Sequence, residues 1–254
     1  MRKVFFFWVS LNMIIPTVLV AQEVVSKEKW GHMYINGNLQ MGIPIESFKS
    51  YLNVPGFGGG GLFVIPIKRD VPLSLGAEFS VMTYATESQD FSANIAGFWS
   101  DFRFTTSSNI FLGHVVMRIQ PAVDGPLRPY VDGMAGFKNL YTRNRLEDLY
   151  GDEDNDFSES ETIKGDWAFS YGGAIGLQLA VFRNPGIMID LRCAYLPGNN
   201  ASYLVRKDDA IFDFNNPREA FEERESPTTI LMPQIGVTFD LNFHHPEEVD
   251  SYDD

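Results

Sequence analysis

The chain is poor in cysteine and in clustered positive charge. Cys193 is its one cysteine, which excludes a disulfide framework, a cysteine-ligated metal cluster and a Cys-x-x-Cys redox pair. The 254 residues carry 20 Lys and Arg against 33 Asp and Glu, a formal net charge of −13, and contain no basic tract. Because neutralising phosphates requires clustered Lys and Arg, this balance argues against nucleic acid as a partner.

Long hydrophobic runs are also scarce. The one long apolar stretch is residues 4–20, which follows Arg2 and Lys3 and ends at a small residue. A charged start, an apolar core and a small residue at the end are typical of a secretory signal peptide, which we predict at 1–21. The alternative is a membrane anchor. It is disfavoured by Pro16 and by a length of about 17 residues, at the short limit for a helical span.

What recurs in the sequence is alternation of apolar with polar or small residues, the pattern of a strand with two different faces. In residues 167–181, large apolar side chains alternate with Ala, Ser, Gly and Gln. Helical periodicity is convincing only at 217–224, where it predicts one short helix. The alternation predicts eight strands, at 33–44, 57–67, 73–84, 109–120, 130–141, 167–181, 187–195 and 229–243.

The connections between these strands alternate in length. Three are short and rich in turn-forming residues, at 68–72, 121–129 and 182–186. Four are long, at 45–56, 86–108, 142–166 and 196–228. Short periplasmic turns and long extracellular loops are typical of outer-membrane barrels. We therefore predict an all-β fold at 22–243, an eight-stranded antiparallel up-and-down transmembrane β-barrel with long extracellular loops.

Alternation alone does not say which face points inward. A soluble lipocalin-like ligand carrier would place its apolar face inside the barrel. Three observations favour the membrane barrel. The polar face is rich in Gly, Ala and Ser, which suits a crowded eight-strand lumen, and it lacks the dense Lys and Glu of a soluble outer face. Aromatic residues also lie near strand ends, as in an interfacial girdle.

Two segments carry a family resemblance. Residues 128–131 (Arg-Pro-Tyr-Val), with Gly133 and Gly136, open the fifth predicted strand, and the closing strand at 236–243 alternates apolar residues and ends in phenylalanine. In these segments the chain resembles the small OmpA-like and OmpX-like outer-membrane barrels, in the version common in Bacteroidetes. The resemblance implies export to the outer membrane of a Gram-negative bacterium. It carries over no catalytic residues, because the family shares none.

Charged residues recur on the face predicted to line the lumen. Isolated charges in a water-poor interior are costly, so we expect these residues to pair. The sequence therefore predicts a structural ion-pair network that fills the barrel, made of Glu78, Arg118, Asp132, Lys138, Asp190, Arg192 and Asp240. The alternative is a narrow gated, porin-like pore that opens when these pairs switch.

No catalytic, metal or cofactor site is predicted. The chain has four histidines but neither His-Glu-x-x-His nor Gly-x-Ser-x-Gly, and His114 is predicted to point inward. In the acidic stretch 147–161, Asp152, Asp154 and Asp156 have EF-hand spacing, but the glycine and the bidentate glutamate of that loop are missing. We expect a solvated acidic loop, with loose divalent-cation binding as the alternative. A lipid-modifying enzyme or protease ranks lower as a function.

The fourth long connection mixes aromatic residues with charges, which is typical of a binding surface. Its predicted interaction residues are Tyr203, Phe212, Phe214 and Phe221; the alternative is that the loops fold over one another and cap the barrel. We therefore predict a non-enzymatic outer-membrane anchor surrounded by outer-membrane lipids. Its extracellular loops, or an acidic periplasmic tail at 244–254, bind a protein partner. The protein acts alone or as a subunit of an envelope complex for secretion or assembly.

Overall fold

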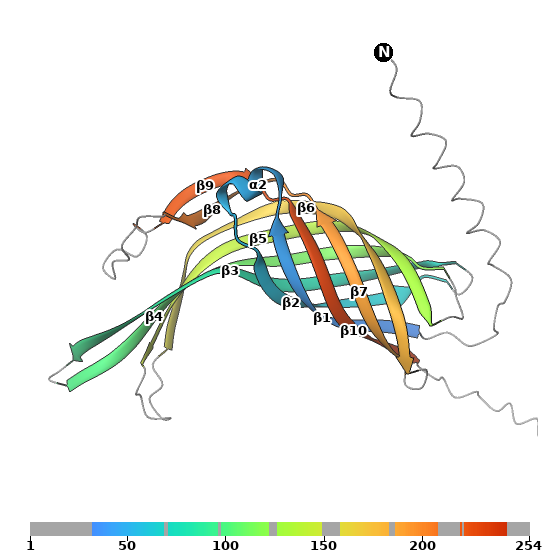
Figure 1. Cartoon of the computed structure of the whole chain (residues 1–254), viewed down its shortest axis with the longest axis horizontal. Coiled ribbons are helices and arrows are strands. Elements are labelled where there is room, and N and C mark those ends of the chain that lie inside the picture. Colours follow the sequence, from blue (N-terminus) through green and yellow to red (C-terminus); the bar gives the residue numbers. More distant parts are fainter. Residues whose placement is uncertain are drawn as a thin grey trace, which may run out of the picture.

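Eight strands close into one antiparallel barrel in the computed structural model, which describes residues 32–68, 71–95, 98–121, 126–148, 158–182, 186–207, 219 and 221–242 (Figure 1). The barrel strands are β1 (His32–Pro44), β2 (Gly56–Pro66), β3 (Leu73–Ile95), β4 (Phe98–Ile119), β5 (Leu127–Asp148), β6 (Ser158–Phe182), β7 (Gly186–Leu196) and β10 (Ile230–Asn242). Pairing of β10 with β1 closes the barrel. This confirms the predicted fold class. The predicted signal peptide and periplasmic tail lie outside the described residues.

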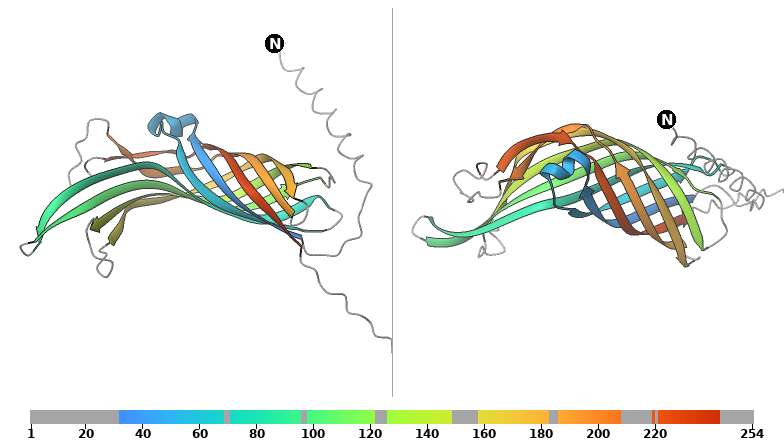
Figure 2. Two further views of the ribbon diagram at one scale, coloured as in Figure 1. Left: turned by 60° about the horizontal axis from the view of Figure 1, so that its bottom comes forward. Right: turned by 45° about the horizontal axis from the view of Figure 1, so that its top comes forward.

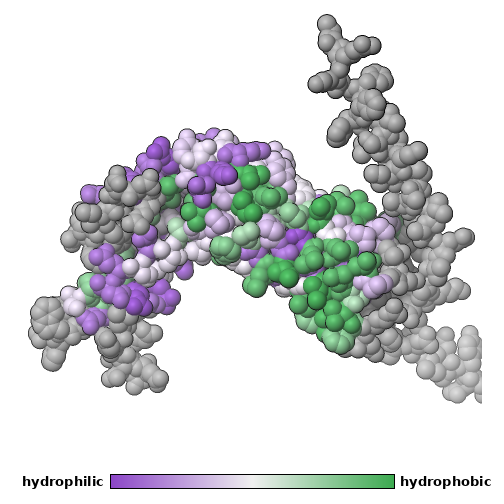
Figure 3. Space-filling model, in the orientation of Figure 1, coloured by the Kyte–Doolittle hydropathy of each residue, from purple (hydrophilic) through white to green (hydrophobic). Residues whose placement is uncertain are grey.

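The outer wall of the barrel is apolar and its lumen is polar. Leu39, Ile175 and Trp167 point outward and are 70%, 67% and 60% exposed, whereas Arg118 and Lys138 point inward and are buried. Figure 3 shows the apolar residues gathered on the barrel. An apolar surface around a polar interior is the reverse of a soluble protein and suits a bilayer, where every backbone polar group is paired within the closed sheet. The chain is therefore a membrane-spanning barrel, and the soluble carrier alternative is wrong.

Four strands continue far beyond the apolar belt. β3, β4, β5 and β6 have 23, 22, 22 and 25 residues, about twice the roughly 9–11 residues that cross a bilayer. The loops predicted at 86–108 and 142–166 are wrong over most of their length, because these residues form paired strands that project as a curved sheet (Figure 2). β-Bulges at Thr83/Ala85 and Thr142/Arg143 lie where the sheet leaves the barrel, and bulges bend strands.

A short helix and a separate hairpin lie over the extracellular end of the barrel (Figure 1). The helix, α2 (Glu46–Tyr51), follows β1, and the hairpin of β8 (Asn200–Arg206) and β9 (Phe221–Pro227) follows β7. The helix predicted at 217–224 is wrong for 221–224, which pair with β8 because that strand supplies their backbone partners. Within the described part of the chain, no helix has the length and hydropathy needed to cross a membrane.

Candidate functional site

Two arginines and two carboxylates form a connected ion-pair network in the lumen. Arg192 binds Glu78 through Nη1 and Oε1 at 2.7 Å, and it binds Asp132 through Nε and Oδ2 at 3.0 Å. Arg118 makes a bidentate pair with the same Asp132 at 2.8 and 3.0 Å. All four side chains are buried. Arg118 and Asp132 are cross-strand partners, but Arg192 reaches strands with which β7 does not pair.

Asp190 forms no ion pair with any described residue, so the ion pair predicted for it is wrong, and it is held by hydrogen bonds from neutral groups. It accepts them from Tyr130 Oη at 2.6 Å, Gln178 Nε2 at 3.1 Å and Thr238 Oγ1 at 3.1 Å. The Arg118 guanidinium lies 3.6 Å from the centre of the Tyr130 ring, which links Asp190 to the ion pairs. Tyr130, Gln178 and Thr238 were not among the residues predicted for this network. The alternation of the strands places all three on the face that lines the lumen, and this was the one feature of the sequence that could have identified them.

Lys138 does not join the network, so the ion pair predicted for it is wrong. Its Nζ donates hydrogen bonds to the backbone oxygens of Leu196, at 2.7 Å, and Thr228. These two residues mark the end of β7 and the approach to β10, so the buried ammonium joins the two ends of the 196–228 segment. Partial negative charge on carbonyl oxygens replaces a carboxylate here. Asp240 lies at the opposite end of β10, paired in register with Tyr34 of β1.

His114 and Ser170 form a hydrogen-bonded pair within the barrel. His114 Nε2 and Ser170 Oγ are 2.9 Å apart, and both residues are buried. A hydroxyl beside an imidazole is half of a nucleophilic site, but a nucleophile must also reach its substrate. Because packed side chains surround both groups, this pair presents no nucleophile at the surface of the barrel.

Apolar side chains close the extracellular half of the lumen. The barrel contributes buried residues including Met82, Ile110, Leu112, Leu140, Leu196, Ile230 and Met232. Phe48 of α2 and Tyr203 of β8 complete the cluster from above, with their rings edge to face at 5.2 Å. Tyr203 Oη is satisfied by Ser226 Oγ at 2.8 Å, and burial raises the pKa of the Tyr203 phenol.

This cap overturns part of the predicted interaction surface. Tyr203 and Phe221 are only 1% and 7% exposed, so their assignment as interaction residues is wrong; the capping alternative describes them. Both face apolar neighbours, which explains why a loop rich in charge keeps aromatic residues. The other two residues of that prediction, Phe212 and Phe214, lie outside the described residues.

The projecting sheet has a hydrophilic outer face. Cross-strand hydrogen bonds there join Ser88 to Thr105 at 3.1 Å and Asp90 to Arg103 at 2.7 and 2.9 Å. The hydrogen bond from the Arg103 guanidinium holds the pKa of the Asp90 carboxyl below its usual value. On the opposite face, the rings of Phe91 and Phe102 stack at 5.7 Å. The sheet therefore has a polar outer face and an opposite face that carries an aromatic pair among polar residues.

Along one long edge of this sheet, no described strand pairs with β3. β2 pairs with β3 only as far as Thr83, and the remainder of β3, residues 85–95, pairs with β4 alone among the described strands. Backbone donors and acceptors along such an edge are a template for another strand.

Metal-binding residues do not gather in the part of the chain that the structure describes, where no group of three or more His, Cys, Asp or Glu side chains has a suitable arrangement. Residues 149–157, with the EF-hand-like aspartates, are not among those described. Cys193 lies on β7 as a partly exposed free thiol.

No family model and no curated protein matches the chain. Solved structures to which it is similar include Neisserial surface protein A, at 12% identity and a TM-score of 0.35, over 84% of this chain and 100% of that one. Another is Ail, the attachment invasion locus protein of Yersinia pestis, at 13% and 0.35 over 84% and 100%. A third is the outer membrane protease OmpT of Escherichia coli, at 10% and 0.32 over 87% and 100%. These values are too low to carry an argument about function.

Proposed function

We propose that this protein is an outer-membrane anchor of a Gram-negative bacterium. It is not an enzyme, and it presents the projecting β3–β6 sheet to a protein partner outside the cell. The observation that carries the proposal is the edge of β3 beyond Thr83, with which no described strand pairs, on a sheet that extends well beyond the apolar belt. The barrel holds this sheet rigidly, because function in such folds depends on segments mounted on a packed scaffold.

The packed lumen supports an anchor over the porin-like alternative. Eight strands leave an interior just wide enough for side chains, and here ion pairs and buried apolar side chains both occupy it. Opening a path would require breaking buried ion pairs, which is strongly unfavourable.

The edge of β3 beyond Thr83 defines the kind of partner. An extended segment of another protein would add to β3 through backbone hydrogen bonds, and its alternate side chains would meet the two faces of the sheet. Phe91, which is partly exposed, offers apolar contact on one face, and Ser88 and Thr105 offer hydroxyl groups on the outer face.

A truncated hairpin tests this function. Ser88 and Thr105 face each other across β3 and β4, so deleting residues 89–104 and joining the ends by Asn-Gly closes a shorter hairpin. We expect the native mass of the protein, extracted from outer membranes in mild detergent, to fall from that of a complex to that of the barrel. Boiling-dependent mobility on a gel would show that the barrel still folds.

The matched control keeps the hairpin at full length. Exchanging the two charges of one pair, Asp90→Arg with Arg103→Asp, preserves the backbone edge and should preserve the complex. A wild-type protein that elutes only as a monomer would contradict the proposal, as would a complex that persists after truncation. The mass of the complex separates a stand-alone surface protein with one partner from a subunit of a larger envelope machine.

A further inference from the structure

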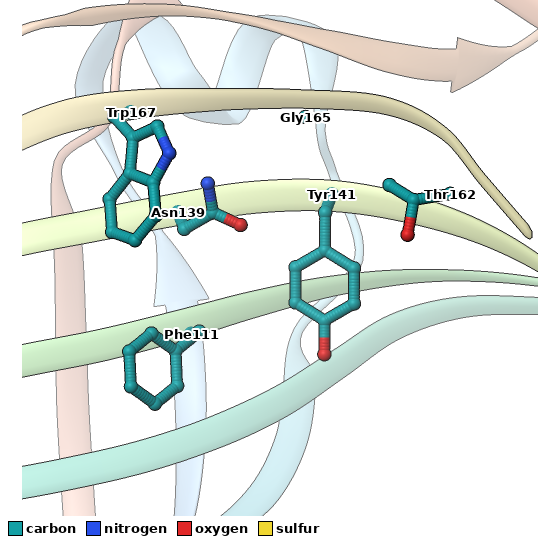
Figure 4. Close-up of a pocket in the computed structure, with 6 residues that line it drawn as sticks. All are labelled: Phe111, Asn139, Tyr141, Thr162, Gly165 and Trp167. Carbon is teal, nitrogen blue, oxygen red and sulfur yellow. The ribbon is translucent and has the colours of Figure 1, made fainter.

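A hollow of about 410 Å³ opens on the outer wall of β4, β5 and β6 (Figure 4). Aromatic rings, an amide, a hydroxyl and a glycine line it: Phe111, Asn139, Tyr141, Thr162, Gly165 and Trp167. Figure 4 shows the Asn139 amide between the Trp167 and Phe111 rings, with Tyr141 further along β5. Neither the ion-pair network nor the projecting edge uses these residues.

The pairing of β4, β5 and β6 determines which residues lie beside one another in this hollow. Asn139 pairs with Phe111 on one side and Trp167 on the other, which places the amide between two rings. In the next row outward, Tyr141 pairs with Gly165. Because glycine has no side chain, space remains beside the Tyr141 ring, and a Cβ at Gly165 would meet only Tyr141 Cβ, at 3.7 Å. Asn139 Nδ2 donates to Asp166 O at 3.3 Å, which orients the amide beside the hollow.

The hollow lies at the boundary between the apolar belt and the polar sheet. On its belt side, a row of rings crosses the outer wall, with Phe79–Phe111, Phe111–Phe137 and Phe137–Trp167 centroids 6.4, 6.0 and 5.1 Å apart. Such aromatic girdles mark the level of lipid headgroups.

On the outer side of the hollow, β5 continues to a cation beside one of the lining residues. Arg143 is the cross-strand partner of Thr162, is exposed, and forms no ion pair with any described residue. Arg143 lies four residues after Asn139 along β5, a rise of about 13 Å. The outer surface therefore changes over this distance from an amide between two aromatic rings to a cation.

We propose that this hollow binds the phosphorylated sugar headgroup of an anionic glycolipid in the outer leaflet. The belt below is covered by acyl chains, so a lipid standing against the wall places its headgroup at this level. The flat apolar face of a sugar ring packs against Trp167 and Tyr141, its hydroxyls bond to Asn139 and Thr162, and its phosphate binds Arg143. A glycerol phosphate headgroup has no flat face for the rings. The inference rests on the outer-membrane location proposed above but not on the protein partner.

Lipid titration of the purified full-length protein, followed by native mass spectrometry, tests this site. The probe is lipid A, a phosphorylated glucosamine disaccharide lipid; phosphatidylglycerol and dephosphorylated lipid A are the comparison lipids. We expect the wild-type protein to prefer lipid A over both. Arg143→Gln removes the cation and Gly165→Leu fills the hollow, and each should weaken lipid A binding about tenfold, the usual size of one lost charge-assisted contact.

Two control variants change similar residues elsewhere on the outer surface. Phe57→Leu alters a belt aromatic on β2 that is 62% exposed, and Arg103→Gln removes an arginine already paired with Asp90. Both should bind lipid A as the wild type does. Boiling-dependent mobility confirms that each variant is folded.

Equal weakening in the control variants would overturn the site, as would unchanged binding in both Arg143→Gln and Gly165→Leu. Phosphatidylglycerol binding as tight as that of lipid A would identify an ordinary anionic-lipid surface and also overturn it. The 89–104 truncation leaves every lining residue in place, so loss of the protein partner and loss of lipid binding are separable. Membrane fractionation tests the location independently.

Discussion

Arg192 connects carboxylates on two strands that do not pair with its own. Glu78 on β3 and Asp132 on β5 both bind its guanidinium, and Gln234 on β10 accepts a further hydrogen bond at 2.7 Å. Only arginine has a planar fork of donors that reaches three groups at once. At the scale of single residues, this side chain is the centre of the lumen network.

Replacing this arginine should destabilise the barrel strongly. Arg192→Met leaves Glu78 buried without the cation that pairs with it, and one oxygen of that carboxylate already has no hydrogen-bond partner among the described groups. We expect the free energy of unfolding to fall by about 3–5 kcal/mol, measured by urea unfolding in detergent with tryptophan fluorescence.

The control is an exposed pair. Arg103→Gln breaks the ion pair with Asp90, in which the two side chains are 43% and 52% exposed, and should leave the free energy of unfolding almost unchanged, because solvent screens an exposed pair. Adding Glu78→Met to Arg192→Met should recover part of the loss, since no buried carboxylate then lacks its cation. Equal costs for Arg192→Met and Arg103→Gln would show that the lumen network contributes little.

At the scale of elements, the close approach of β2 to β3 decides where a side chain can be accommodated. The glycines of β2 differ in the space around them: a Cβ at Gly58 would lie 1.9 Å from the backbone oxygen of Val81, whereas at Gly61 the nearest atom, Asn36 O, is 3.6 Å away. The two positions belong to one run of four glycines but face different sides of the strand.

This difference predicts opposite outcomes for two substitutions of the same type. Gly58→Ala forces β2 away from β3 and should reduce the folded fraction and lower the melting temperature. Gly61→Ala should fold as the wild type does. Mobility of unboiled samples on a gel, followed over a temperature series, measures both quantities. Similar melting curves for the two variants would contradict this account of the β2–β3 contact.

The length of the strands was the least predictable feature at this scale. Within the membrane, alternation is visible because one face is apolar. Beyond the bulges, both faces of β3 and β4 carry Ser, Thr and charged residues, so the alternating hydrophobic signal ends although the backbone pairing continues. The sequence therefore predicted loops where the structure has a sheet.

At the scale of the whole molecule, the lumen is closed by two different kinds of packing. Ion pairs centred on Arg118 and Arg192 lie among buried apolar residues, and further apolar side chains with α2 and the β8–β9 hairpin close the extracellular end. The two seals are independent, because the hairpin does not contribute to the ion pairs.

The protein should therefore conduct no ions. In planar bilayers we expect no current steps from the wild-type barrel, and none after deletion of residues 200–227, since the Arg192 network remains. A leak that appears only after this deletion would show that the apolar cap is the principal seal. Steady conductance of the wild type would instead support the porin-like alternative.

The sequence by itself determined the strand number of the barrel, the antiparallel topology and which side chains face lipid. These properties follow from a period of two, which the extended backbone imposes locally. Only the tertiary structure decided which inward charges meet. Arg192 lies 114 residues from Glu78 in the chain and Lys138 lies 90 residues from Thr228. Those contacts cross the lumen between strands that are not neighbours, so they depend on the register of every intervening pair and on the cap above them, neither of which a local pattern contains.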